Sequence, residues 1–223
     1  MINFLHTFQP SRVLFELGPL TVYWYGFLYM VALAVGLFVT RWIARKRGIA
    51  TPWLFDIALW MFLGGIAGAR LWYVLLIEPL HFFSYPFEVV AFWNGGLAIH
   101  GGIIGAVLVL WFWTKRHGLN PLSLADLFAP ALALGQAIGR WGNYFNQELH
   151  GGLTNLPWGI PVEFGNASAG VSAVAYVHPT FLYESFLDLI LFGLLAWFVL
   201  RVPRPGRVAA MYIAGYAVIR FVV

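Results

Sequence analysis

Long apolar runs joined by short charged loops constrain this chain more than any other feature of its sequence. Six runs cover roughly residues 20–44, 53–77, 96–113, 124–138, 179–200 and 208–223. Hydrophobic residues make up 61% of the chain, charged residues make up 10%, and the mean hydropathy is +0.78. A water-soluble domain needs more polar surface than this, whereas a bilayer accepts helices of about 20 apolar residues. The sequence therefore predicts an all-α polytopic integral membrane protein with about six transmembrane helices.

The distribution of charge predicts the orientation in the membrane. None of the nine acidic residues lies in the loops that follow the first, third and fifth runs. By the positive-inside rule these loops are cytoplasmic, which places the amino terminus outside. The same pattern excludes a nucleic-acid-binding patch, although the formal net charge is +4. Nine of the thirteen basic residues occupy these loops: Arg41, Arg45, Lys46, Arg47, Lys115, Arg116, Arg201, Arg204 and Arg207.

One membrane domain is expected over residues 1–223, with a small extracytoplasmic lobe inserted at 141–178, where Gly, Pro and Asn are frequent. We expect no cleavable signal peptide, because the first strong basic cluster follows the first apolar run. The last run, Val208 to Val223, spans only about 24 Å as a helix, against a hydrocarbon core of about 30 Å. We therefore expect the native chain to continue, with a seventh span.

The densest polar segment of the chain runs from Gly139 to Gly151, at the end of an apolar run. An arginine, two asparagines, a glutamine, a glutamate and a histidine fall between Arg140 and His150. Polar groups at the edge of a membrane span are costly unless they have partners. This segment is therefore the first candidate for a functional site.

Three arginines outside the basic loops lie within an apolar run or close to its end, at Arg70, Arg140 and Arg220. Each could pair with a carboxylate or cap a helix, which is the favoured interpretation for Arg70. Arg140 and Arg220 are better candidates for function, because two arginines facing one cavity suit an anion such as a lipid phosphate.

His100 stands between glycines at the outer start of the third run and is the best candidate for a general base. Tyr25 and Tyr216, each beside a glycine or near an arginine, are the tyrosines of interest. A metal site is not expected, since the histidines and acids show no ligand spacing and the chain has no cysteine. The pairs Gly64/Gly68 and Gly101/Gly105 predict close helix packing.

These motifs resemble a known family. Gly139 to Glu148 is similar to the signature Gly-Arg-x-Gly-Asn-Phe-x-Asn-x-Glu of bacterial phosphatidylglycerol–prolipoprotein diacylglyceryl transferases, with Tyr144 for the phenylalanine. The resemblance covers nearly the whole chain, through Trp24-Tyr25-Gly26, Gly68-Ala69-Arg70, Asn94-Gly95-Gly96, His100-Gly101-Gly102, Asp126, His178-Pro179, Leu182-Tyr183-Glu184, Gly215-Tyr216 and Arg220-Phe221.

The resemblance implies an enzyme of the bacterial cytoplasmic (inner) membrane. It would move the diacylglyceryl group of phosphatidylglycerol to the thiol of the lipobox cysteine in the signal peptide of a preprolipoprotein, and release glycerol phosphate. Neither a metal nor another cofactor is implied, and a cysteine-free enzyme is compatible because the substrate supplies the nucleophile.

We assign hypothetical roles to the candidate residues. His100 would be the base, Tyr25 or Tyr216 would orient this base or the substrate, and Arg140 and Arg220 would stabilise the leaving phosphate. Asn143, Asn146 and Glu148 would hold the headgroup glycerol or fix the arginines. Two further candidates for substrate binding are Gly151 and Arg70.

Two other classes of protein remain open. A lipid or anion transporter would use the arginines for binding and release, although no internal repeat suggests alternating access. A non-catalytic lipid-binding scaffold would not need so dense a polar motif. Product formation distinguishes the enzyme from both.

Overall fold

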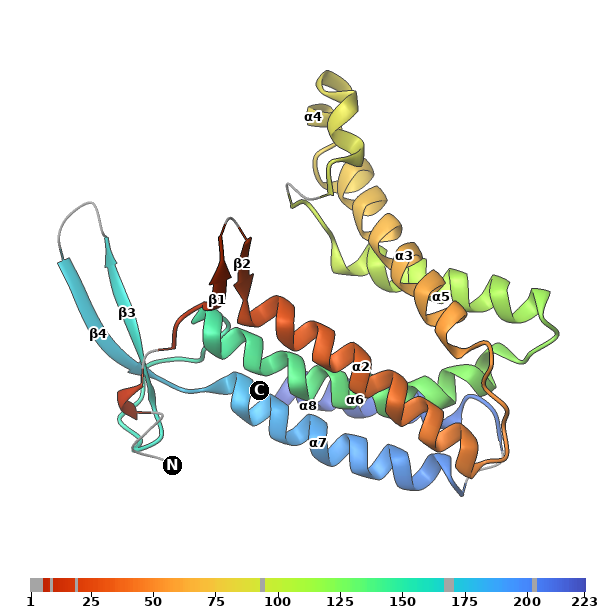
Figure 1. Cartoon of the computed structure of the whole chain (residues 1–223). Helices are drawn as coiled ribbons and strands as arrows, with labels where there is room; N and C mark the ends of the chain where they lie inside the picture. The colour runs from red at the N-terminus through yellow and green to blue at the C-terminus, as the bar shows by residue number, and fades with distance from the viewer. Residues whose placement is uncertain (1–5, 9, 19, 93–94, 167–170, 202–203) are drawn as a thin grey trace. The chain divides into compact units, whose positions relative to one another are not determined.

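The computed structural model describes residues 6–8, 10–18, 20–92, 95–166, 171–201 and 204–223 (Figure 1). The chain forms two compact units, one made of Met1–Ile43 with Asp126–Val223 and one made of Ala44–Ala125. Each unit is described by itself. The expectation of one membrane domain with an inserted lobe stays a prediction.

The predicted all-α membrane architecture is confirmed. Four helical segments among the described residues are long and apolar enough to cross a membrane: α2 (Trp24–Lys46), α3 with its π-helical end η1 (Leu54–Ile77), α6 (Pro121–Asn146) and α7 (Thr180–Val199). Two further helices, α5 (Ile99–Arg116) and α8 (Arg207–Val222), follow the remaining apolar runs. The count of six spans stays a prediction.

Small residues bring the helices of the first unit together. A Cβ added to Gly36 of α2 would lie 3.8 Å from the Cβ of Ala131 on α6. On the other side of α6, the Ser185 hydroxyl of α7 donates a 2.7 Å hydrogen bond to the carbonyl of Ala137. Close backbone approach and side-chain hydrogen bonds are the forces that join helices where lipid removes the hydrophobic driving force.

Asp126 joins α6 to the start of α8. Its carboxylate accepts the backbone N–H groups of Gly206 at 2.7 Å and Ala209 at 2.8 Å, and the residue is 3% exposed. The first N–H groups of a helix have no partner within the helix and carry partial positive charge. The buried carboxylate of Asp126 accepts these N–H groups and balances their partial positive charge, which gives a structural reason for an acidic residue at this position.

The structure corrects the predicted start of the first span. The helix begins at Trp24, not at Leu20, because β1 (Val13–Leu17) pairs antiparallel with β2 (Leu20–Tyr23). The run Leu-Thr-Val-Tyr is rich in β-branched and aromatic residues, which favour an extended backbone. Gly18, with φ of +58°, lies at the turn.

The helix that carries the polar motif is also longer than predicted. The expected segment was 124–138, whereas α6 runs from Pro121 to Asn146. Residues 140–146 are therefore helical rather than part of the lobe. This matters for function because helical spacing puts Arg140 and Asn143 on one face.

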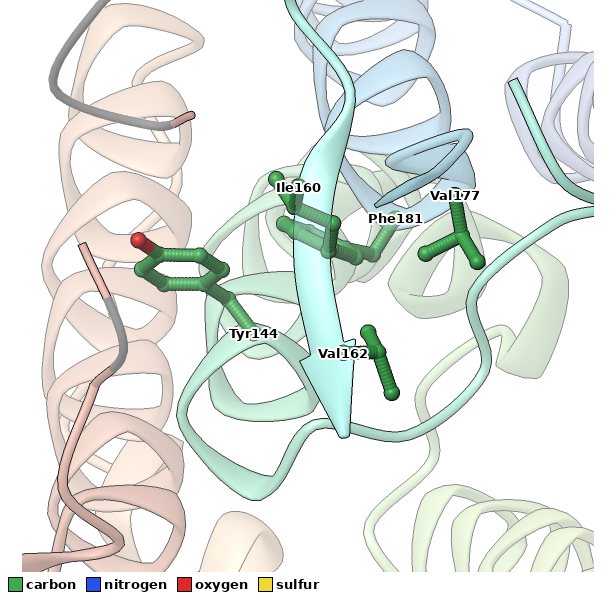
Figure 2. Packing of buried hydrophobic residues seen from close by; sticks show 5 residues of the cluster. All are labelled: Tyr144, Ile160, Val162, Val177 and Phe181. Atoms are coloured by element: carbon green, nitrogen blue, oxygen red, sulfur yellow. The ribbon is translucent and has the colours of Figure 1, made fainter. Parts of the chain in front are cut away.

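The segment 141–178, predicted as a lobe, contains two short strands. β3 (Ile160–Asn166) and β4 (Val171–Val177) form an antiparallel hairpin in which Ile160 pairs with Val177. Its base packs against the ends of α6 and α7 through five buried residues (Figure 2): Tyr144, Ile160, Val162, Val177 and Phe181.

In the second unit α3 packs tightly on α5, and the predicted glycine pairs make the contact. A Cβ on Gly68 would overlap the carbonyl oxygen of Gly101, and one on Gly105 would overlap that of Gly64. The connection from α3 to α5 contains α4 (Pro79–Ser84) and the 3-10 turn η2 (Pro86–Val90).

Replacing Gly68 by alanine should push α3 and α5 apart. The new methyl group meets backbone atoms that cannot rotate away, so we expect a loss of about 1–3 kcal/mol in stability. In detergent this corresponds to a fall in Tm of about 2–12 °C. The matched control is Gly193→Ala on α7, where a Cβ would meet no atom within 4 Å. Equal Tm values for the two variants would contradict the proposed packing.

Candidate active site

A single buried carboxylate draws together residues from three helices of the first unit. Glu184 of α7 is 2% exposed, and its Oε1 accepts hydrogen bonds from Nη2 of Arg140 on α6 and from the Tyr216 hydroxyl of α8, the latter at 3.3 Å. Its Oε2 accepts one from Nη1 of Arg220 at 2.8 Å. Nη2 of Arg140 also donates to the Tyr216 hydroxyl at 3.1 Å. We call Arg140, Glu184, Tyr216 and Arg220 the arginine–glutamate cluster.

Local helix geometry explains how the cluster forms. Tyr216 and Arg220 are four residues apart on α8 and so lie on the same face. Glu184 lies in the first turns of α7, and Arg140 lies near the end of α6. The structure thus brings together the two arginines and the tyrosine named in the sequence analysis, with Glu184 as their shared partner.

The cluster has the charge and exposure of an anion site. Two guanidinium groups face one carboxylate, so these three side chains carry one excess positive charge. The Arg140 side chain is 17% exposed and that of Arg220 is 52% exposed, which leaves a surface where an anion can approach. Guanidinium groups bind phosphate oxygens through paired N–H donors.

A second hydrogen-bond network supports Arg140 from the side. Asn143 accepts from Nη1 of Arg140 at 3.5 Å and donates to Oε1 of Glu148 at 3.0 Å. Asn146 donates to the same Glu148 oxygen at 3.2 Å. Three of the predicted residues therefore form one chain of contacts that ends on the arginine.

The backbone beyond α6 turns sharply so that Glu148 can reach back. Gln147 and Leu149 have φ of +56° and +54°, in the left-handed region, and the N–H of Glu148 donates to the carbonyl of Asn143 at 3.0 Å. A left-handed residue directly after a helix is a common way to end it.

Gly151 lies where this turn meets the start of α7. Its N–H donates to the carbonyl of His178 at 2.8 Å. A Cβ there would approach the Thr180 Cγ2 to 2.8 Å and the His178 Cβ to 2.9 Å. The close approach explains the glycine, and substrate binding by Gly151 stays a prediction.

Tyr25 of α2 lies against the polar end of α6. A Cβ on Gly142 would come within 2.6 Å of the Tyr25 Cδ2, so the glycine allows the ring to pack there. The Tyr25 hydroxyl is 3.2 Å from that of Tyr29. Beside Tyr25 opens a cavity of about 820 Å³ that is also lined by Asn146 and Glu148.

Arg70 and His100 belong to the second unit, whereas the other predicted site residues belong to the first. Arg70 is 8% exposed. Its guanidinium group donates hydrogen bonds to the backbone carbonyls of four described residues: Glu88, Val89, Gly95 and Gly96. It thereby holds the connection that leads into α5. Asn94, which the resemblance includes, lies outside the described residues.

His100 occupies the first turn of α5 and is exposed. Its ring stacks on Trp72 with centroids 6.1 Å apart. Gly101 follows it at the close contact with Gly68. The histidine is thus presented at the end of a rigid helix pair.

The sequence analysis missed Asp188. This residue is fully buried on α7, one turn after Glu184, and neither carboxylate oxygen has a hydrogen-bond partner among the described residues. An acidic residue within an apolar span is itself a functional signal, because burying it is costly. That signal was available in the sequence between residues 180 and 199.

The described residues contain no group of three histidine or acidic side chains able to hold a metal ion.

Comparison with known proteins agrees with the motifs. The family model described as prolipoprotein diacylglyceryl transferase matches residues 12–223. A protein of Gloeobacter violaceus is 42% identical over 216 residues, covering 96% of this chain and 80% of its own. A Synechocystis protein is 39% identical, covering 96% and 78%, and one from Trichormus variabilis is 40% identical, covering 97% and 78%. All three are named phosphatidylglycerol–prolipoprotein diacylglyceryl transferase.

Replacing Glu184 by glutamine should destabilise the fold as well as the site. It leaves two arginines without their shared counter-charge, and removing one partner of a buried pair costs about 3 kcal/mol or more. For a chain of this size that lowers Tm by about 6–12 °C.

The control is Glu88→Gln, whose carboxylate forms an exposed pair with His81 at 2.9 Å. Such a pair contributes about 0–1 kcal/mol. Thermal unfolding of both variants in detergent tests the prediction, and a Glu184 variant as stable as the control would contradict it.

Proposed function

Because the chain belongs to the prolipoprotein diacylglyceryl transferase family, we propose how its residues divide the work of that reaction. The protein is a multi-pass bacterial membrane protein and a transferase. It uses phosphatidylglycerol to modify prolipoproteins, in the first step of lipoprotein maturation.

The acceptor is the thiol of the lipobox cysteine in the prolipoprotein. The 223 residues contain no cysteine, which agrees with a nucleophile supplied by the substrate. The sulfur attacks the glyceryl carbon that carries the phosphate oxygen. A C–S bond forms and the C–O bond breaks, glycerol phosphate leaves with the electron pair, and the thiol proton passes to a base.

Arg140 and Arg220 stabilise the leaving phosphate. Negative charge grows on the phosphate as the C–O bond breaks, and preorganised donors aimed at that charge lower the barrier. The single observation that carries this proposal is that both guanidinium groups meet on Glu184, which fixes them side by side.

Asn143, Asn146 and Glu148 act by holding Arg140. Glu148 contacts Asn143, which contacts Nη1 of Arg140. These contacts favour a role in holding Arg140 rather than in binding the headgroup glycerol directly. Tyr216 orients Arg140 through its 3.1 Å hydrogen bond. Substrate contact by Arg70 stays a prediction, since its contacts are with backbone carbonyls.

His100 is the base that receives the thiol proton. An imidazole has a reference pKa near 6.5, which suits proton transfer near neutral pH, and a thiol near 8.5 needs such help. Tyr25, which borders the cavity beside Glu148, orients the substrate.

The protein lies in the cytoplasmic membrane with its amino terminus and its lobe outside. The basic loops support this orientation. Phosphatidylglycerol would then reach the arginine–glutamate cluster laterally from the bilayer.

Arg140→Ala should lower kcat/KM for transfer about 100-fold or more, since one charged donor to the developing phosphate charge is lost. The assay mixes the reconstituted protein with phosphatidylglycerol and a lipobox peptide with one cysteine, and mass spectrometry measures the diacylglyceryl adduct. Arg204→Ala, an exposed arginine outside the site, is the matched control. Undiminished adduct from the Arg140 variant would remove this residue from the mechanism.

His100→Asn should lower kcat about 100-fold at neutral pH. The residual rate of this variant should rise as the pH approaches about 8.5, the ordinary pKa of a thiol. Without the base, the reaction depends on thiolate that forms by ionisation of the substrate in solution. His117→Asn, at the other end of α5, is the control. A His100 variant that keeps most of its activity would exclude the histidine as base.

A further inference from the structure

The cavity beside Tyr25 is lined by none of the four residues of the arginine–glutamate cluster, and the proposed function does not say which substrate it holds. It measures about 820 Å³ and lies within the first unit. Its walls come from β2, the first turns of α2 and the turn after α6, and they include Arg12, Thr21, Val22, Phe27, Met30 and Gln147.

The cavity is connected to the cluster by contacts at the end of α6. Glu148 lines the cavity and is tied through Asn143 to Arg140. Tyr25, which also lines the cavity, packs on Gly142, two residues beyond Arg140. A transfer between two substrates requires both to be held within contact distance at once. If the arginines hold the phosphate of phosphatidylglycerol, the nearby cavity is available to bind the prolipoprotein.

The lining fits an extended peptide better than a second phosphate. Arg12 is the one basic side chain in the lining, whereas the cluster offers two arginines. Hydrogen-bonding groups such as Thr21 and Gln147 stand beside apolar Phe27 and Met30. A peptide with polar backbone and small apolar side chains needs both kinds of contact.

Strand β2 offers a further means of binding. It pairs with β1 in a two-stranded sheet, and Thr21 and Val22 lie both on this strand and in the cavity wall. The outer edge of such a strand presents N–H and C=O groups to an added strand. Hydrogen bonds to the backbone contribute affinity with little dependence on the sequence of the bound peptide.

We propose that this cavity is the binding site for the prolipoprotein. The extended segment around the acceptor cysteine lies along Thr21 and Val22, with the thiol near Tyr25. This inference rests on the proposed function, because it assumes that the arginines hold the lipid phosphate.

The absence of cysteine from the chain makes a direct test possible. Single cysteines are introduced by Thr21→Cys and Met30→Cys in the cavity wall, and by Phe38→Cys as the control. Phe38 lies on the same helix as Met30, is 71% exposed and is outside the cavity lining. The probe is a lipobox peptide whose one cysteine is activated as a mixed disulfide, added in detergent without phosphatidylglycerol.

We expect disulfide trapping in the cavity to be about tenfold faster than at Phe38→Cys or more, because binding raises the effective concentration of the peptide cysteine. An excess of the same peptide with serine for cysteine should suppress trapping in the cavity and leave the control rate unchanged. Two cavity variants are used so that the test still works if one of them does not fold. The Tm of both variants is measured to check that they fold.

Equal rates at all three positions, without competition by the serine peptide, would overturn the proposal. Competition by phosphatidylglycerol headgroup but not by the serine peptide would also overturn it, by assigning the cavity to the lipid. Trapping needs no turnover, so its failure is distinct from failure of the proposed function. The latter is measured by adduct formation in the cysteine-free protein and its Arg140 variant.

Discussion

The carboxylate of Glu184 is the interaction on which the first unit and its site depend. It is buried on α7 and accepts hydrogen bonds from Arg140 of α6 and from Tyr216 and Arg220 of α8. Without it, two guanidinium groups would repel each other in a medium of low dielectric constant. With it, they are held side by side and still carry one excess positive charge. The same contact therefore stabilises the helix packing and prepares a site for a phosphate.

Elsewhere in the chain, hydrogen bonds to backbone groups satisfy buried charged side chains. Asp126 accepts the first N–H groups of α8 and so fixes the start of the helix that carries Tyr216 and Arg220. In the second unit Arg70 donates to backbone carbonyls of residues 88–96, in the connection that leads to His100. These two charged side chains within apolar segments are satisfied by backbone groups, which lowers the cost of burying them.

Sequence reasoning selected candidate site residues but could not predict how they are arranged. Arg140, Asn143, Glu148 and Arg220 were recognisable because polar residues are rare in apolar runs. The end of α6 was placed too early, because a segment that contains an arginine, a glycine and two asparagines resembles a loop until the partners of its polar groups are known. The strand at Leu20 was missed for a similar reason, since a short apolar strand and the start of an apolar helix have the same composition.

The sequence by itself determined that this is a helical membrane protein, where its basic loops lie, and which polar segment is unusual. These properties depend on composition and on local order, which the chain carries without folding. Only the tertiary structure decided that Glu184 is the shared partner of arginines 44 and 36 residues away, and that Asp126 caps a helix 80 residues further on. Such pairs depend on which helix faces pack together, and packing is decided by small residues and hydrogen bonds that act between segments distant in the chain.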